Sequence, residues 1–358
     1  MFATHKQVIE ELLTLGLRTS VLEAHSSITE NEVFVVHDVF KTGPVTVIEQ
    51  ELSIYRDLQA HLGNQFNNIF PQVVMRFRGE QLAVIEMTWL GRSLYDEVFK
   101  PLSWGEWASV LAHSPDAPPI LAKLALADKA IDRTLDHLEM IFVSSRQDDP
   151  RLADAFTKEI LGALRVNLQR ASLLPELEHD MVSIEKAHDL WSTGLVCSCC
   201  HRDLMIQHIF MTEHNEKVDV RFADPRSCVP HYDETPTGRT MVPNSIGCAA
   251  VDFAHLELSL VRAQMELKQI QPEIVVVALE RVRKCVLNWV KLQRFSSAFY
   301  YLALTTWYTQ YAWWPPKLGK IPPAELRWLY DDMVTKARQR VASCAALARG
   351  EDISDMAI

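Results

Sequence analysis

Two stretches, CHRDLMIQHIFM (residues 200–211) and VDVRFADPR (residues 218–226), each join charged residues to a strand-like apolar run. Asp203 comes just before the first run, and Asp224 comes just after the second. The strands of a hairpin lie side by side, so the residue before the first strand and the residue after the second meet at one end. The sequence therefore predicts that both carboxylates converge, at a site suited to binding Mg²⁺ and to accepting a proton from a hydroxyl group.

The tetrapeptide HRDL (residues 201–204) resembles the catalytic loop of the protein-kinase superfamily. The tripeptide DPR (residues 224–226) stands where that superfamily has its metal-binding Asp. Together with VDFAHLE (residues 251–257), this form is similar to the aminoglycoside-phosphotransferase-like branch, which includes choline, sugar and antibiotic kinases. The resemblance covers roughly residues 20–300.

That resemblance implies an α+β, two-lobed protein-kinase-like fold with a small β-rich N-lobe and a large helical C-lobe. We expect residues 1–87 to form the N-lobe, with an N-terminal helix, antiparallel strands and one further helix. Residues 88–350 would form the helical C-lobe, with the catalytic β-ribbon near residues 195–226. The last residues, 351–358, are predicted to be an acidic tail.

Apolar periodicity predicts the individual elements. Strands are expected at residues 19–24, 32–37, 73–77 and 82–87. Helices are expected at residues 5–15, 49–62, 120–143, 152–173, 178–191, 249–269, 272–293, 297–312 and 323–349. Residues 45–48 fit either a short strand or the entry to the following helix.

The resemblance also implies roles in the catalytic ribbon. Asp203 would act as the base that takes or positions the acceptor hydroxyl, and Asp224 would hold Mg²⁺ against the nucleotide phosphates. His208 stands where the catalytic-loop pattern has Asn, and imidazole suits softer metals better than Mg²⁺, so the metal preference is open. Arg226 and Arg202 are candidates for binding a phosphate or an anionic part of the substrate. Taken alone, each aspartate also fits an ordinary turn residue.

The N-lobe match is less complete. Glu51 is the candidate for the helix glutamate that pairs with a strand lysine, and Glu49 is the second candidate. The lysine is expected near residues 37–38, where neither residue is Lys. Lys41 is nearest and reaches the phosphates if the strand extends that far; otherwise it is a solvated turn residue.

The remaining nucleotide contacts are expected from two segments. The loop at residues 26–31 has no glycine, so Ser27 and its neighbours would replace a glycine-rich phosphate cover. The chain at Glu86, Met87 and Thr88 resembles the hinge between lobes, whose backbone would contact adenine. A strand–turn–helix without any ligand is the alternative.

Three further features have structural explanations. The resemblance implies that Asp252, at the start of an apolar helix, ties the catalytic loop from below. The cysteine-rich segment at residues 197–201 could suggest a metal site, but adjacent strand residues point to opposite faces, which favours buried thiols. The aromatic cluster at residues 307–314 fits a helix core or a stacking surface for substrate.

Composition narrows the class of protein. The chain has 358 residues, 48% of them hydrophobic, which is enough for two lobes with a full core. Its formal net charge of −10 disfavours nucleic acids and anionic membranes as main partners. No apolar run is long enough for a spanning helix, no export signal is evident, and seven cysteines are expected to be reduced, so we expect a cytoplasmic protein.

The sequence thus predicts a phosphotransferase that uses ATP, or GTP, with Mg²⁺ to phosphorylate a hydroxyl of a small molecule. Sugars, aminoglycosides and other natural products all remain open as acceptors, and so does the oligomeric state. A catalytically silent, pseudokinase-like binding module is the alternative, favoured by the unmatched strand lysine, the absent glycine loop and His208. A protein kinase is a third interpretation, disfavoured because no Ala-Pro-Glu-type segment follows Asp224.

Overall fold

The fold is described from a computed structural model, over residues 25–26, 32–35, 38–88, 90–99, 118–214, 217–226, 245–267, 272–313 and 327–351. The helix expected at residues 5–15 and the strand expected at residues 19–24 lie outside this part of the chain, as does Ser27.

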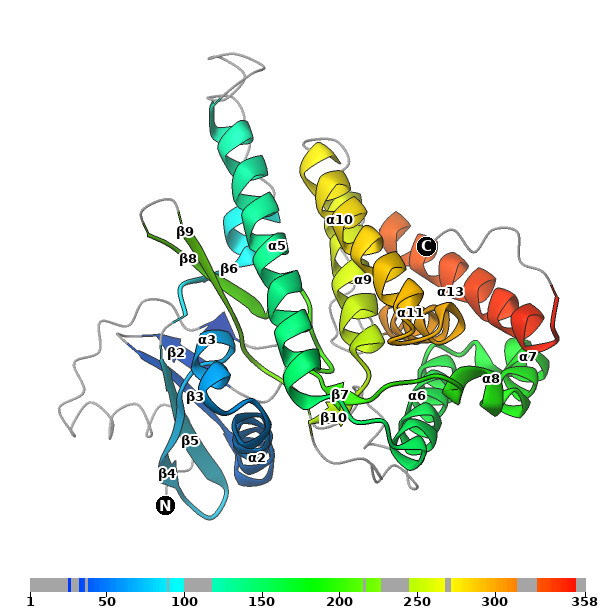
Figure 1. The fold of residues 1–358 in the computed structure, drawn as a ribbon, viewed down its shortest axis with the longest axis horizontal. Helices are drawn as coiled ribbons and strands as arrows, with labels where there is room; N and C mark the ends of the chain where they lie inside the picture. The colour runs from blue at the N-terminus through cyan, green and yellow to red at the C-terminus, as the bar shows by residue number, and fades with distance from the viewer. Residues whose placement is uncertain are drawn as a thin grey trace.

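A five-stranded antiparallel sheet forms one end of the molecule, in the order β1-β2-β3-β5-β4 (Figure 1). Its strands are β1 (His25–Ser26), β2 (Glu32–Val35), β3 (Asp38–Pro44), β4 (Val73–Arg78) and β5 (Leu82–Thr88). The strands predicted at residues 73–77 and 82–87 match β4 and β5 to within one residue at each end. Ala83, Val84 and Ile85 of the central strand β5 are fully buried.

Helix α2 (Val45–Leu62) packs on this sheet and carries one apolar face. Ile48, Leu52, Tyr55 and Leu58 recur at helical spacing and are all buried. The helix begins directly after Pro44, so residues 45–48 are its first turn and not a separate strand. Two short helical turns follow, η1 (Gly63–Gln65) and α3 (Phe66–Ile69).

A three-stranded antiparallel sheet, β6-β8-β9, carries the predicted hairpin. Its strands are β6 (Arg92–Ser93), β8 (Ile209–His214) and β9 (Lys217–Phe222). Strand β8 begins later than expected, because a turn closed by the His208 N–H and the Met205 carbonyl oxygen (2.8 Å) separates it from Asp203. A second small sheet pairs β7 (Ser198–Cys199) with β10 (Ile246–Gly247).

The rest of the described chain is helical. Its helical elements are η2 (Tyr95–Phe99), α5 (Pro118–Ser145), α6 (Pro150–Arg170), α7 (Leu174–Lys186), α8 (His188–Ser192), α9 (Ala249–Leu267), α10 (Pro272–Lys291), α11 (Ser297–Tyr311) and α13 (Arg327–Ala348). The helix predicted at residues 178–191 is two helices, which meet at Ala187. Figure 1 shows α5 between the strands and the group formed by α6 to α13.

Helix α11 is the core of this helical part. It is buried nearly all round, and its aromatic side chains Trp307, Tyr308 and Tyr311 are in the interior, as is Trp313 just beyond it. The aromatic cluster is therefore core, and it does not form an open stacking surface. The expected α+β arrangement, with a small β-rich part and a large helical part, is present.

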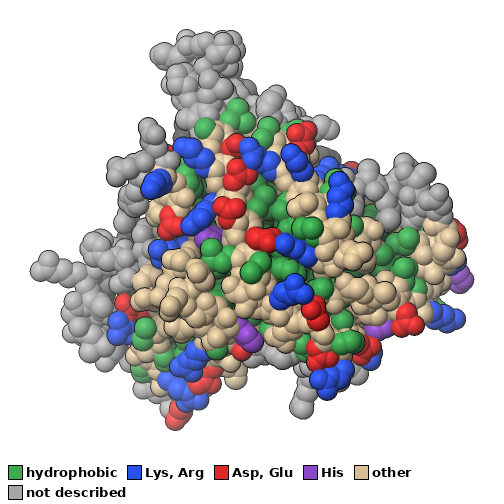
Figure 2. Space-filling model, viewed as in Figure 1, with side chains coloured by type: hydrophobic (Ala, Val, Ile, Leu, Met, Phe, Trp, Pro, Cys, Tyr) green, Lys and Arg blue, Asp and Glu red, His purple; other side chains and the backbone are tan. Residues whose placement is uncertain are grey.

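The described surface is mixed in charge. On the face shown in Figure 2, acidic and basic side chains are interspersed among apolar ones. Within the described ranges, no helix is both long and apolar enough to cross a bilayer.

Gly91 connects the two lobes at a point of close backbone approach. Its φ is +88°, and a Cβ there would lie 2.1 Å from the backbone oxygen of Met211 on β8. The next two residues, Arg92 and Ser93, pair with β8. A side chain at residue 91 would therefore push the connection away from the strand that follows the catalytic loop.

We predict that Gly91→Ala lowers the free energy of unfolding by about 2–5 kcal/mol, because it adds a backbone clash to a left-handed conformation. Gly194→Ala is the matched control: Gly194 has φ +71°, but a Cβ at residue 194 would have no neighbour within 4 Å, so this change should cost only about 1–2 kcal/mol. Urea denaturation of both variants measures the difference. Equal losses would contradict the clash.

Candidate active site

The two predicted carboxylates converge. Asp203, His208 and Asp224 each offer a ligand atom, and these atoms all lie within 4.8 Å of one another. Backbone hydrogen bonds beyond the hairpin hold the two segments together: the Ala223 N–H donates to the His208 carbonyl, and the Arg226 N–H donates to the His201 carbonyl, both at 3.0 Å. The hairpin geometry expected from the sequence is thus present.

Asp252, in the first turn of α9, holds the start of the catalytic loop. Its two carboxylate oxygens accept the backbone N–H groups of His201 (2.8 Å) and Arg202 (2.7 Å). Asp252 is fully buried and lies on the protein side of the loop. Asp252 therefore anchors the backbone of the loop, which is the structural role that the resemblance implies.

Lys41 links the sheet to the hairpin. Its Nζ lies 2.7 Å from Oε2 of Glu51 on α2 and 2.6 Å from Oδ1 of Asp224. Burial alone would lower the pKa of Lys41, but the attraction of Asp224 and Glu51 outweighs it and raises the pKa above its usual value. Strand β3 extends through Pro44, which is what the phosphate role of Lys41 requires. Glu49 instead pairs with Arg78 on the exposed side of the sheet.

Asp224 stays ionised although its side chain is only partly exposed. Burial alone would raise its pKa, but the positive charges of Lys41 and Arg226 hold it well below the usual range. Its φ is +63°, and its backbone N–H donates to the hydroxyl of Tyr55 on α2 (3.0 Å). The carboxylate is therefore anchored by both its side chain and its backbone.

Asp203 is nearly buried and has a neighbour at each carboxylate oxygen. Nε of Arg226 lies 3.2 Å from Oδ2, and Nδ1 of His255 lies 3.3 Å from Oδ1. Burial raises the pKa of Asp203, while His208 and Arg226 act in the opposite direction. A raised pKa suits a group that must accept a proton.

His208 is held in one tautomer. Its Nδ1 lies 2.8 Å from the backbone oxygen of Asp203, an atom that can only accept, so Nδ1 carries the hydrogen. In the neutral ring Nε2 then has the free lone pair, and it faces Oδ2 of Asp224 at 3.5 Å. This arrangement, with one nitrogen bound to backbone and the other open, is typical of a metal-ligating histidine.

The donor set fits a divalent cation. Three carboxylates, of Glu51, Asp203 and Asp224, face the two cations Lys41 and Arg226, which leaves a negative balance at the site. Carboxylate oxygens suit Mg²⁺, and an added imidazole favours transition metals.

The substrate role expected for Arg202 is wrong, because its side chain points into the protein. It is fully buried, pairs with Glu159 of α6 (Nη1 to Oε1, 3.3 Å) and donates to the backbone oxygen of Ile246. A φ of +63° at Arg202 turns the side chain inward. Arg226 is the arginine that faces the two aspartates.

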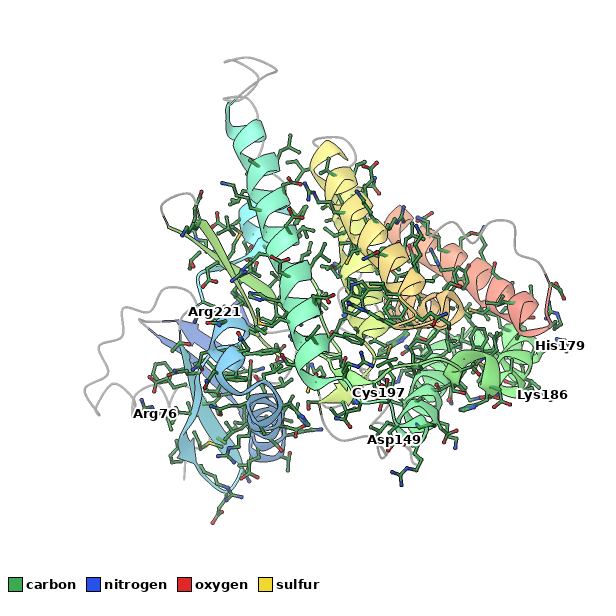
Figure 3. All side chains as sticks on the ribbon, viewed as in Figure 1. Arg76, Asp149, His179, Lys186, Cys197 and Arg221 are labelled. Carbon is green, nitrogen blue, oxygen red and sulfur yellow. The ribbon has the colours of Figure 1, made fainter. Side chains whose placement is uncertain are left out.

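The adenine contacts expected from Glu86, Met87 and Thr88 also need correction. Glu86 and Met87 pair with both β3 and β4, and Thr88 pairs with Asp38 of β3, so this segment belongs to the sheet. The Thr88 N–H donates to the carbonyl of Gln72 (3.1 Å), and the Glu86 side chain pairs with Arg76, on the side of the sheet away from α2 (Figure 3).

Three residues at the site escaped the sequence reasoning. Tyr55 and Glu159 support Asp224 and Arg202, and no local pattern identifies them. His255 had a detectable signal: it lies three residues after Asp252 in α9 and therefore on the same helix face.

The cysteines near the loop are interior thiols. Cys197, Cys199 and Cys200 are free and buried, and burial raises the pKa of Cys197 to about 12. Figure 3 shows Cys197 at the junction of α5 and α6, where it pairs with Gln147.

We predict that Glu159→Gln lowers the free energy of unfolding by about 3–5 kcal/mol, because it removes a carboxylate charge that pairs with the fully buried Arg202 guanidinium. Glu176→Gln removes one partner of the exposed pair with Arg338 and should cost less than about 1 kcal/mol. Denaturant unfolding followed by tryptophan fluorescence compares the two. A cost for Glu159→Gln as small as the control's would show that the buried pair contributes little.

Comparisons with known proteins agree on the fold. No protein-family profile matches the sequence, and no match is found among curated proteins. The aminoglycoside phosphotransferase APH(3'')-Id from Streptomyces rimosus superposes with a TM-score of 0.50 at 16% identity, covering 86% of this chain and 98% of that one. A glucosamine kinase matches at a TM-score of 0.46 and 12% identity, covering 96% of this chain and 83% of that one. The chain therefore has the protein-kinase-like fold seen in aminoglycoside phosphotransferases.

Proposed function

We propose that the protein is a phosphotransferase that moves the γ-phosphoryl group of ATP or GTP to a hydroxyl group of a small molecule. The observation that carries this proposal is the meeting of Asp203, His208 and Asp224 with the Lys41–Glu51 ion pair at one place. Phosphoryl transfer asks the protein mainly to position the reactants and to neutralise charge. These residues supply both.

Each residue has a distinct part. Asp203 orients the acceptor hydroxyl and takes its proton, a contribution of about 10²–10⁴-fold in rate. Lys41, held by Glu51, binds phosphate oxygens in place of its contact with Asp224. Arg226, which now contacts both aspartates, turns to a phosphate oxygen or to an anionic part of the acceptor.

Asp224 and the open nitrogen of His208 would hold a divalent cation. Such a cation, Mg²⁺ or a softer divalent metal, would neutralise the phosphate charge of the nucleotide. The negative balance of the site supports this assignment.

The nucleotide would lie between two lobes, residues 1–87 and residues 88–350, with residues 351–358 as a tail. Since Glu86, Met87 and Thr88 are used in the sheet, we place the adenine contacts on the chain that follows Thr88. We propose the acceptor class by analogy: APH(3'')-Id, which shares the fold, is an aminoglycoside phosphotransferase, so we expect a sugar, an aminoglycoside or another natural product.

Nucleotide binding and turnover test the proposal. ATP and GTP affinities are measured with and without divalent cation, followed by nucleotide consumption across a panel of aminoglycosides, amino sugars and choline-like alcohols. Cation-dependent binding with acceptor-dependent consumption supports a phosphotransferase. Binding without consumption for any acceptor favours the silent, pseudokinase-like module, and no nucleotide binding at all refutes both.

We predict that Asp203→Ala reduces turnover by at least about 10²-fold while nucleotide affinity changes little, since Asp203 acts on the acceptor. Asp219→Ala, on the exposed side of β9, is the matched control and should retain turnover. Rates and calorimetric affinities are compared for both. Undiminished turnover by Asp203→Ala would remove Asp203 from the mechanism.

We further predict that the wild-type site prefers Mn²⁺ over Mg²⁺ and that His208→Asn reverses the preference by about tenfold or more, because an amide oxygen replaces imidazole. Calorimetric titration of Mn²⁺ and Mg²⁺ into the protein with a non-hydrolysable nucleotide gives both affinities. His61→Asn, on the outer part of α2, serves as control and should change neither. An unchanged ratio in His208→Asn would show that His208 is not a ligand.

A further inference from the structure

His255 of α9 lies directly behind Asp203. Its Nδ1 is 3.3 Å from Oδ1 of Asp203, and its Nε2 is 3.4 Å from the hydroxyl of Tyr311 on α11. Both ring nitrogens thus face a polar partner in a fully buried position. We propose that His255 is a positioning residue that holds the Asp203 carboxylate in the orientation needed to receive the acceptor hydroxyl, an inference that rests on the proposed function.

The protonation state of His255 follows from its surroundings. Burial, with His208 and His201 nearby, lowers the pKa of His255 well below its usual value, so the ring is neutral and carries one hydrogen. Nδ1 makes no hydrogen bond in this structure, although it lies 3.3 Å from Oδ1 of Asp203. An ionised carboxylate can only accept, so we place the hydrogen on Nδ1, where a small shift completes a bond to Asp203. Nε2 then accepts the hydroxyl hydrogen of Tyr311. The chain Tyr311–His255–Asp203 therefore has one consistent direction of donation.

The imidazole ring has little freedom to turn. It stacks on the indole of Trp307, with ring centroids 3.8 Å apart and planes inclined by 12°. The indole is itself fixed, because its Nε1–H donates to the Val251 carbonyl oxygen (3.1 Å). The stacking on Trp307 therefore keeps Nδ1 of His255 facing Asp203.

Helix α9 supports the loop at several points along one face. Asp252 binds the backbone of His201 and Arg202, and the hydroxyl of Ser259 accepts the Ile206 N–H (3.2 Å). His255 lies between Asp252 and Ser259 on the same face. The helix thus fixes the backbone on both sides of Asp203 and, through His255, its side chain.

The two oxygens of Asp203 consequently have different tasks. Oδ1 is directed to His255 in the interior, whereas Oδ2 faces Arg226, which is partly exposed. Once Arg226 turns to a phosphate group, Oδ2 is available to the acceptor and His255 remains as the contact that orients the carboxylate. Such contacts are often long in the free enzyme and shorten when substrates bind. Misplacing a reactive group by about 1 Å can cost about 10²-fold in rate.

Three substitutions separate positioning from packing. His255→Leu removes the donor, and we expect kcat to fall about 10–10²-fold with little change in the KM for nucleotide. His255→Asn places an amide N–H near the position of Nδ1 and should recover most of kcat. Tyr311→Phe, which removes one hydroxyl group, should give a smaller loss by freeing the tautomer. Thermal unfolding of each variant reports whether it is folded.

A spectroscopic readout tests the inference without turnover. In ¹⁵N-labelled protein the His255 ring should show the hydrogen on Nδ1, and Asp203→Ala should shift that resonance. A folded His255→Leu protein with wild-type kcat, equal losses in the Leu and Asn variants, or a hydrogen on Nε2 would each overturn the proposal. Wild-type protein that binds no nucleotide would instead refute the proposed function, whatever the tautomer of His255.

Discussion

The hydrogen bonds that the loop's backbone N–H groups donate to Asp252 are the constraint on which the site depends. They hold the backbone at His201 and Arg202, where Arg202 adopts a φ of +63°. A left-handed conformation costs a non-glycine residue about 1–2 kcal/mol and persists only when the surroundings fix it. Asp224 has the same φ and is fixed by Tyr55. The segments that carry Asp203 and Asp224 are thus held in unfavourable backbone conformations by contacts from helices, and these contacts keep the two carboxylates together.

Helix α2 connects these segments to the five-stranded sheet. Tyr55 accepts the Asp224 N–H, and Asp57, half a turn on, accepts the N–H of Ser245 just before β10 (3.1 Å). Glu51, one turn before Tyr55, then meets Lys41. Because three residues of α2 contact the site or its surroundings, the helix places Glu51 against Lys41 by the same packing that fixes Asp224. Glu159 of α6 likewise pairs with the buried loop arginine, Arg202.

The sequence predicted the features that depend on the spacing of residues along the chain. It missed the features that depend on where a side chain points. The hairpin brought Asp203 and Asp224 together as expected, because strand pairing fixes which ends meet. The inward turn of Arg202 was not predictable, since a left-handed residue reverses the direction that strand alternation implies. The role of Lys41 stayed open because its reach depends on where β3 ends. His255 was within reach of the sequence, as a residue one helical turn after Asp252.

The contrast between the two neighbours of Asp203 has a chemical reason. A base must retain the proton that it takes, so a permanent positive charge close to it weakens it. Arg226 carries such a charge but is partly exposed; in the proposed mechanism it would turn to the phosphates, where its charge is useful. His255 cannot move, and its burial keeps it neutral, so it orients the carboxylate without lowering its proton affinity as a cation would. In this arrangement His255 orients the Asp203 carboxylate from the interior, and Arg226 supplies positive charge from the partly exposed side. A lysine or arginine at residue 255 would place a permanent positive charge beside Asp203 and weaken Asp203 as a base. A buried neutral donor therefore suits this position.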